Sequence, residues 1–189
     1  MHGWRTPRSS ENGEPGNYAA MADPVTFESI LASGTATPWR GNVFRVMLND
    51  FPPDRENTRG ARWNPPETPA IYTCLEPSVC IAEVEYGLSR QPTPVKPDLR
   101  KTLYEISVSL SAVLDITEVL FSLGGIGIDL SHLHADDMKI SQEIGRLVTW
   151  FGYDGLLVPS ARGIGNNLVI YPGRAREGYR FEVIGHSAL

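Results

Sequence analysis

The chain has 189 residues, of which 41% are hydrophobic and 21% are charged, and these are ordinary values for one globular domain. Its formal net charge of −5 argues against a nucleic-acid groove, because phosphate binding depends on clustered lysine and arginine side chains. No run approaches the roughly 18 apolar residues of a membrane-spanning helix, and the first residues lack the apolar core of a signal peptide. We therefore predict a cytoplasmic domain that binds neither membrane nor nucleic acid directly.

The N-terminal segment differs from the rest of the chain. Residues 1–22 are rich in Gly, Pro, Ser, Asn and charged side chains. Such a segment buries too little apolar surface to offset the entropy lost on ordering it. We expect a flexible tail over residues 1–22, in which Met21 offers an alternative start, and a folded domain over residues 23–189.

Short runs of β-branched and aromatic residues bounded by turn residues predict the strands of this domain. The predicted strands are residues 43–48, 70–74, 101–116 (one long strand or two joined by a bend), 155–160, 167–172 and 179–185. Two segments instead show helical spacing of apolar residues. One runs from Pro77 to Leu88, and the other covers 136–152, with Asp136 or Asp137 as its cap and Gly152 at its end. These elements predict a compact, strand-rich α+β domain.

Several weaker patterns have ordinary interpretations. The glycine pairs 125/127 and 163/165 lack the third glycine of a dinucleotide-binding loop, and we interpret them as turn formers. Cys74 and Cys80 match neither a CxxC site nor a disulfide framework, so we interpret them as buried apolar residues. His132 and His134 precede two aspartates, but no third ligand has metal-site spacing. A polar loop leading into a helix is favoured there over a metal site.

Two carboxylates on the first predicted helix are more informative. Glu83 and Glu85 lie on a helix with apolar residues around most of its circumference, which predicts burial on more than one side. An unpaired buried charge is costly, so these side chains must reach partners or a cleft. On a helical wheel Glu85 lies closer to the main apolar stripe than Glu83 does. The wheel alone therefore does not select Glu83.

The segment before that helix carries an arginine on a restricted backbone. Arg62 lies in the sequence GARWNPP, where Gly60, Asn64 and two prolines limit the backbone conformation. A guanidinium presented in this way suits bidentate binding of phosphate or carboxylate, although a surface ion pair is the ordinary alternative. Trp63 and Tyr72 are equally consistent with simple packing.

The order of these features is similar to that of the RES domain family. The landmarks are Arg45 in VFRV, then GARWN, Tyr72, an Ala-Glu pair on the next helix and LLVPSA…GNNLVIYP, and together they span residues 43–172. RES domains resemble ADP-ribosyltransferases, consume NAD+ and act as toxins of RES–Xre toxin–antitoxin modules. The resemblance therefore implies an ADP-ribosyltransferase-like fold that cleaves the nicotinamide–ribose bond, without a metal. Residues 117–137 form an insert without a counterpart that we can place.

The resemblance also implies roles for individual residues. The catalytic residues it implies are Glu83, Arg62 and Tyr72, and the substrate-binding residues are Arg45, Ser160 and Asn167. The partners it implies are NAD+ as substrate and an Xre-type antitoxin, and it is compatible with a homodimer. The acceptor of the ADP-ribosyl group stays open between water, phosphate and protein.

Two other interpretations are also consistent with the sequence. One is a non-catalytic RES-like protein that binds NAD+ or a partner. The other is a plain cytosolic α+β domain in which Arg62, Tyr72 and Glu83 form an ion-pair network in the core.

Overall fold

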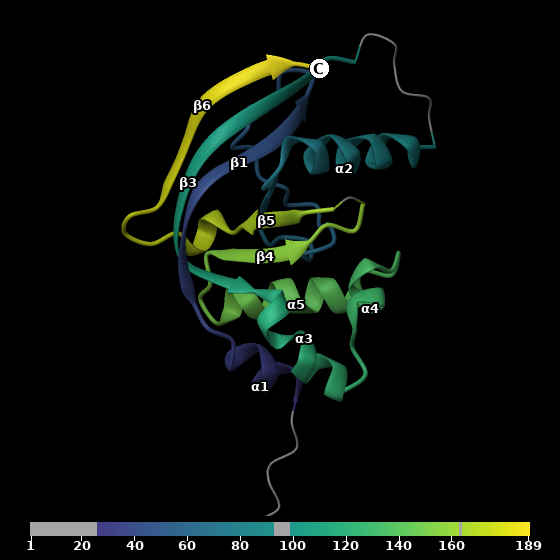
Figure 1. Cartoon of the computed structure of the whole chain (residues 1–189), viewed down its shortest axis with the longest axis vertical. Helices are drawn as coiled ribbons and strands as arrows, with labels where there is room; N and C mark the ends of the chain where they lie inside the picture. Colours follow the sequence, from purple (N-terminus) through teal and green to yellow (C-terminus); the bar gives the residue numbers. More distant parts are fainter. Residues whose placement is uncertain (1–25, 93–98, 163) are drawn as a thin grey trace, which may run out of the picture.

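A computed structural model describes residues 26–92, 99–162 and 164–189 (Figure 1). The predicted tail at 1–22 and the predicted turn at Gly163 lie outside these residues. Within them the strands are β1 (Thr37–Leu48), β2 (Ile71–Cys74), β3 (Lys101–Asp115), β4 (Gly155–Pro159), β5 (Asn166–Ile170) and β6 (Arg180–Ala188). The helices are α1 (Phe27–Ala32), α2 (Pro77–Ser89), α3 (Ile116–Gly125), α4 (Leu130–His134), α5 (Lys139–Trp150) and the short 3₁₀ helix η1 (Pro172–Arg174). None of the described helices is long and apolar enough to cross a membrane.

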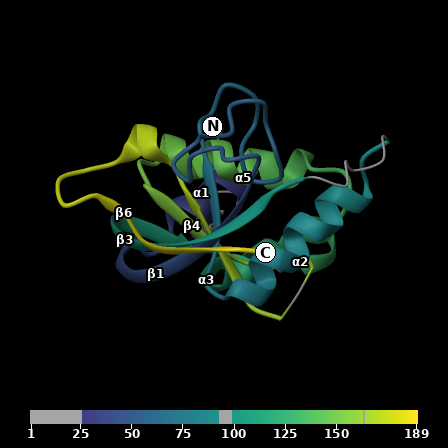
Figure 2. The same ribbon diagram turned by 90° about the horizontal axis from the view of Figure 1, so that it is seen from above.

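The strands form a sheet that closes on itself. Its order is β1-β2-β5-β4-β3-β6, and an additional pairing joins β1 to β3. The long strand β3 pairs with β1 and β6 along most of its length, and its last residues pair in parallel with β4. Figure 2 shows β1, β3 and β6 as one curved layer, seen from above. The strand β3 therefore connects this curved layer to the second layer of β2, β5 and β4.

Helices lie on both sides of the second layer. Figure 1 shows α2 on one side of β4 and β5, and α1, α3, α4 and α5 on the other. The largest apolar cluster lies between the second layer and this helical group, and it includes Leu31, Ile144, Val148 and Leu156. A smaller cluster of Val46, Cys74, Val79 and Cys80 lies under α2. The predicted single, strand-rich α+β domain is confirmed.

The strand β1 is longer than its sequence pattern indicated. It begins at Thr37, whereas the pattern predicted a start at Val43. Pro38, Gly41 and Asn42 are turn residues in most contexts. Here β3 supplies pairing partners from Thr37↔Val113 to Leu48↔Lys101, with one register shift between Thr37 and Trp39, and this pairing overrides the local preference.

Residues 117–137 contain regular structure, so the predicted polar loop around the histidines was wrong. The helix α4 is capped by Asp129, whose side chain accepts hydrogen bonds from Ser131 N at 2.9 Å and His132 N at 3.3 Å. Its Leu133 is fully buried. An isolated five-residue helix has little stability of its own, so this burial is what holds α4 in place.

The predicted cap of α5 was also wrong, by one or two residues. The cap residue is Met138, and Asp137 instead accepts a hydrogen bond from Lys139 N at 3.1 Å. Gly152 ends the helix in the left-handed conformation, with φ of 83°, as predicted.

One glycine fixes how closely α5 approaches the segment before β2. A Cβ added at Gly145 would lie 1.9 Å from the carbonyl oxygen of Trp63. Gly145→Ala should therefore lower the free energy of unfolding by about 3 kcal/mol, because the backbone carbonyl cannot move away freely. Gly124→Ala is the matched control, since nothing lies within 4 Å of its added Cβ, and it should raise stability by up to about 1 kcal/mol. Urea unfolding of both variants measures the difference, and equal stabilities would contradict this packing.

Candidate active site

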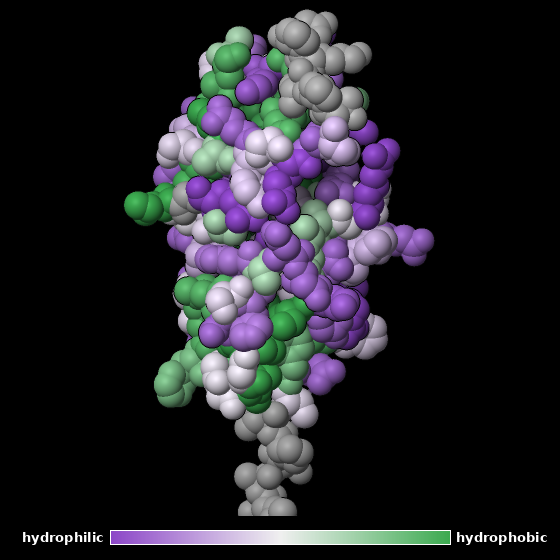
Figure 3. Space-filling view, turned by 90° about the vertical axis from the view of Figure 1, so that its right-hand side faces the viewer, coloured by the Kyte–Doolittle hydropathy of each residue, from purple (hydrophilic) through white to green (hydrophobic). Residues whose placement is uncertain are grey.

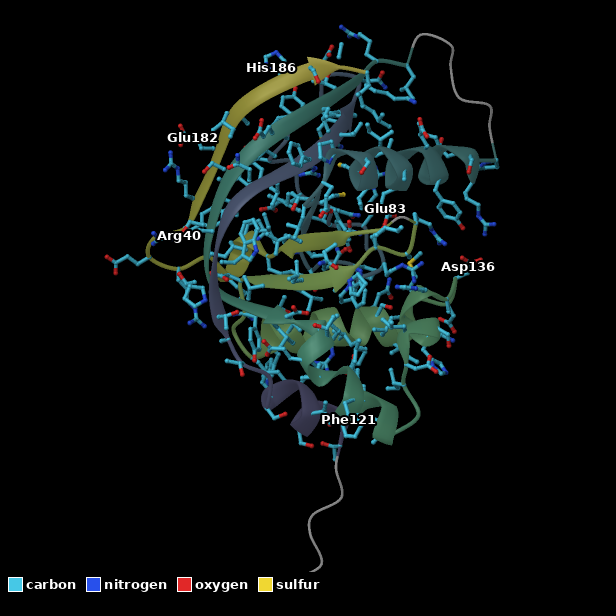
Figure 4. All side chains as sticks on the ribbon, in the orientation of Figure 1. Arg40, Glu83, Phe121, Asp136, Glu182 and His186 are labelled. Atoms are coloured by element: carbon cyan, nitrogen blue, oxygen red, sulfur yellow. The ribbon has the colours of Figure 1, made fainter. Side chains whose placement is uncertain are left out.

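A cavity of about 350 Å³ lies between α2, the second layer of strands and the segment before β2. Figure 4 shows Glu83 in the space between α2 and β5, on the side of the molecule where Asp136 lies. On this side, hydrophilic residues gather in a band across the middle of the face (Figure 3). Five of the six predicted site residues line the cavity: Arg45, Arg62, Tyr72, Glu83 and Asn167. The sixth, Ser160, reaches it through a hydrogen bond to Glu83.

The carboxylate of Glu83 is held by two side chains from the opposite wall. Its Oε1 accepts a hydrogen bond from Ser160 Oγ at 2.6 Å and from Asn167 Nδ2 at 3.0 Å. Among the described residues that line the cavity, Glu83 is the only carboxylate. The site therefore combines one fixed negative charge with a cavity that is partly open to solvent.

The helical wheel was misleading about α2. Only Val79 and Cys80 are buried among its residues, so the helix has one narrow buried face and the prediction of burial on several sides was wrong. Glu83 lies four residues after Val79 and three after Cys80, which places it on that same face. Glu85 is exposed. The apolar stripe centred on Ile81 and Val84, which are only partly buried and pack against the cluster under α2, and it left out the buried Val79.

The β4–β5 hairpin positions the two residues that hold Glu83. Asn167 pairs with Val158 across the hairpin, and Ser160 N donates to Gly165 O at 2.9 Å, which closes the turn. Gly165 has φ of 141° and packs against the first turn of α2, where a Cβ would lie 2.7 Å from a methyl carbon of Val79. The hairpin can therefore approach α2 closely enough for the Glu83 contacts.

One atom of this wall is buried without a partner. Asn167 Oδ1 is inaccessible to solvent and accepts no hydrogen bond within the described part of the chain. Buried acceptors in native proteins are nearly always satisfied. Since Asn167 lines the cavity, a donor on a bound ligand could satisfy this oxygen.

Tyr72 organises the arginine-bearing segment through its hydroxyl group. This hydroxyl donates to Asn64 Oδ1 at 2.7 Å and accepts from Trp63 N at 2.9 Å. Burial raises the pKa of Tyr72 well above its usual value, so it stays a neutral phenol. The fully buried Asn64 in turn donates to Asn57 O and Thr68 O. Trp63 is a core residue, at 3% exposure.

Arg62 contacts the insert that the sequence could not place. Its Nη1 donates to Leu133 O and Ala135 O, both at 2.7 Å, so the guanidinium holds the end of α4 beside the cavity. Burial lowers the pKa of Arg62, and the positive charge of Arg162 lowers it further. Arg162 approaches the same segment, because its Nη2 lies 3.9 Å from an oxygen of Asp136, the residue after Ala135.

Arg45 contacts the segment that follows β1. Its Nη1 donates to Pro53 O at 2.5 Å and its Nη2 to Arg55 O at 2.7 Å. Burial lowers the pKa of Arg45 to about 10, so it is still a cation at neutral pH.

The cysteines and histidines form no metal site in the described residues, where no group of three or more His, Cys, Asp or Glu side chains could hold an ion. Cys74 and Cys80 are free, buried thiols, as predicted, and both line the cavity.

Sequence reasoning missed two features of the site. The first is Asn64. Its position in GARWN, next to residues that limit the backbone conformation, was the one indication of its role. The second is Arg162. The guanidinium of Arg162 lies 3.7 Å from the ring centre of Tyr86 and joins the β4–β5 hairpin to α2. A contact between two such distant segments leaves no local pattern in the sequence.

The fold and the site together define a small α+β domain with one fixed carboxylate in a cavity between a helix and a β-hairpin. The RES domain family model matches residues 35–188, so the chain belongs to the RES domain family, and the resemblance found in its motifs is confirmed.

Known proteins of this type are similar to the chain. It is 33% identical over 122 residues to the NAD(+) phosphorylase MbcT of Mycobacterium bovis and of Mycobacterium tuberculosis, a stretch that covers 63% of this chain and 65% of each relative. The chain thus matches slightly less than two thirds of their length. A solved structure described as the M. tuberculosis MbcT-MbcA toxin-antitoxin complex matches with a TM-score of 0.70 and 26% identity, covering 85% of this chain and 89% of the other.

The Asn64 side chain offers a direct test of how the segment before β2 is held. Asn64→Ala should lower the free energy of unfolding by about 2–3 kcal/mol, because it removes the acceptor of the Tyr72 hydroxyl proton and the donor to Thr68 O and Asn57 O, and leaves a cavity at a fully buried position. Asn42→Ala is the control, since the Asn42 amide makes an exposed hydrogen bond to Glu105, and its effect should stay below about 0.5 kcal/mol. Denaturant unfolding checks both values, and an Asn64 variant as stable as the control would show that this network is dispensable.

Proposed function

We propose that this protein cleaves the bond between nicotinamide and ribose in NAD+. The observation that carries the proposal is the Glu83 carboxylate, fixed by Ser160 and Asn167 in a cavity of a RES domain. As nicotinamide leaves, positive charge develops on the ribose, and a carboxylate beside it stabilises charge that grows only in the transition state. Nicotinamide leaves as a neutral molecule and needs no proton, so a single carboxylate is sufficient.

The neighbouring side chains suit the same reaction. Asn167 Oδ1 can accept a hydrogen bond from a ribose hydroxyl, which would satisfy the one unpartnered buried acceptor of this wall. The Tyr72 ring can stack on nicotinamide while its hydroxyl stays bound to Asn64. Arg62 keeps donor groups free beyond its contacts with α4, and a guanidinium suits a diphosphate. In this proposal Ser160 positions Glu83, and Arg45 acts through the segment after β1.

We further propose inorganic phosphate as the acceptor of the ADP-ribosyl group. The relatives called NAD(+) phosphorylase support this choice, as do Arg62 and Arg162, whose guanidinium groups contact the neighbouring residues Ala135 and Asp136. Phosphate attack at the ribose carbon would displace nicotinamide and leave ADP-ribose phosphorylated at that carbon.

The biological role that we propose is that of a toxin held in check by an antitoxin. The support is the solved toxin–antitoxin complex to which the chain is similar. An antitoxin of the Xre type and a homodimer, both expected from the RES resemblance, stay predictions. Because NAD+ is a metabolite of the cytoplasm, the protein would act there.

The direct experiment is to incubate the purified protein with NAD+, with and without inorganic phosphate, and to follow free nicotinamide. The proposal expects rapid release that depends on phosphate. Release at the same rate in phosphate-free buffer would make water the acceptor, and no release under either condition would leave a non-catalytic RES domain.

Two glutamates on α2 allow a matched test of the catalytic group. Glu83→Gln keeps size and hydrogen-bond acceptors but removes the charge, and it should lower kcat about a hundredfold or more, which corresponds to roughly 3 kcal/mol of transition-state stabilisation. Glu85→Gln changes an exposed side chain on the same helix and should leave kcat within about twofold. Nicotinamide release measures both, with thermal unfolding as the control for folding. The reverse ranking would mean that Glu83 is not the catalytic group.

A further inference from the structure

A second hollow adjoins the cavity that holds Glu83. It has a volume of about 540 Å³ and is lined by the end of β1 and by part of the segment 49–60. Arg45, Val46, Met47 and Asn57 line both the cavity and this hollow, so the two spaces adjoin at the end of β1. The proposed reaction at Glu83 does not by itself use the second hollow.

The size of the substrate calls for a second compartment. NAD+ consists of two nucleotides joined through a diphosphate. The cavity at Glu83, about 350 Å³, is near the lower end of the volumes typical of small-molecule sites, roughly 300–1,000 Å³. With the nicotinamide riboside at Glu83, the adenosine diphosphate part needs room outside this cavity.

Contacts on the α4 side of the cavity favour the second hollow as the place where the adenosine diphosphate part binds. Arg62 donates to Leu133 O, which fixes the end of α4 against the cavity wall. Arg90, just after α2, pairs with Asp136 at 3.2 Å, which joins α2 to the segment between α4 and α5. These contacts leave less room for a ligand on the α4 side. The second hollow, by contrast, shares four lining residues with the cavity.

The residues of the second hollow suit a nucleotide. Phe51 is 44% exposed, and the guanidinium of Arg55 lies 3.8 Å from the centre of its ring. Arg59 lines the same hollow, and Glu56 is the only carboxylate among the described residues that do so. Arginine matches the geometry of a diphosphate, and aromatic and guanidinium planes stack on nucleobases.

We infer that the second hollow binds the adenosine diphosphate part of NAD+, with Arg59 at the diphosphate and the Phe51–Arg55 pair stacked on adenine. This inference rests on the proposed function. It also explains the contacts of Arg45, which hold the carbonyl groups of Pro53 and Arg55 and so position the segment that carries the three recognising side chains. Arg45 is therefore a positioning residue for this subsite.

The test compares NAD+ with nicotinamide mononucleotide, which has the same scissile bond but lacks the adenosine monophosphate part. Phe51→Ala and Arg59→Gln should each raise the KM for NAD+ by about tenfold while kcat/KM for nicotinamide mononucleotide stays within about twofold. Phe121→Ala and Arg40→Gln are the matched controls, and both residues lie away from Glu83 (Figure 4). These controls should leave the kinetics of both substrates unchanged.

Other kinetic outcomes would overturn the inference. One is a wild-type protein that uses the two substrates with equal kcat/KM. Another is a pair of variants that change both substrates equally, because the segment would then have only a structural role. A KM for NAD+ that neither variant changes would also overturn it.

Binding of ADP, measured by calorimetry, separates this inference from the proposed function because it needs no turnover. We expect ADP to bind the wild type and to bind both variants about tenfold more weakly. If the wild type releases no nicotinamide but binds ADP in this way, the proposed function fails and the nucleotide subsite stands. If the wild type turns over NAD+ but ADP does not bind, the subsite fails and the proposed function stands.

Discussion

The carboxylate of Glu83 connects two parts of the molecule that are far apart in the sequence, the helix α2 and the β4–β5 hairpin. It projects from α2 and accepts hydrogen bonds from Ser160 and Asn167 on the β4–β5 hairpin. Removing a carboxylate from water is costly, and two hydrogen bonds to the charged form offset part of that cost. The same bonds fix the direction of the charge. In the proposed reaction, a carboxylate that is already aligned needs little reorganisation as positive charge develops on the ribose.

The segment before β2, which forms another wall of the cavity, is also held rigidly, and here the hydrogen-bonding groups are neutral. Asn64 and the Tyr72 hydroxyl hold the segment before β2 from within. From below, Tyr171 donates to Trp63 O at 2.8 Å, and Gly145 lets α5 come close to that carbonyl group. Arg62 therefore projects from a segment whose backbone is held in place by these contacts. The insert α3–α4 adds to this wall through the carbonyl groups that Arg62 contacts.

Local sequence patterns predicted α2, β2, β4 and β5 because each lies between clear turn residues and has one consistent period. They failed where tertiary contacts decide. The first residues of β1 are turn formers that only β3 makes extended, and α4 exists because Leu133 is buried. Within the site, the helical wheel placed Glu85 closer than Glu83 to the apolar stripe, because that stripe centred on the partly buried Ile81 and Val84 and left out the buried Val79. Only the RES motifs selected Glu83. Neither these motifs nor the local patterns predicted the contacts of Asn64 and Arg162.

The most direct test of the account is a crystal structure with a carbocyclic NAD+ analogue, which keeps the shape of the substrate but cannot lose nicotinamide. The account predicts that the ring replacing the ribose lies beside Glu83, with a hydroxyl group within about 3 Å of Asn167 Oδ1. Nicotinamide would lie against Tyr72. An analogue bound with this ring outside the cavity, or with Glu83 turned away from it, would contradict the account.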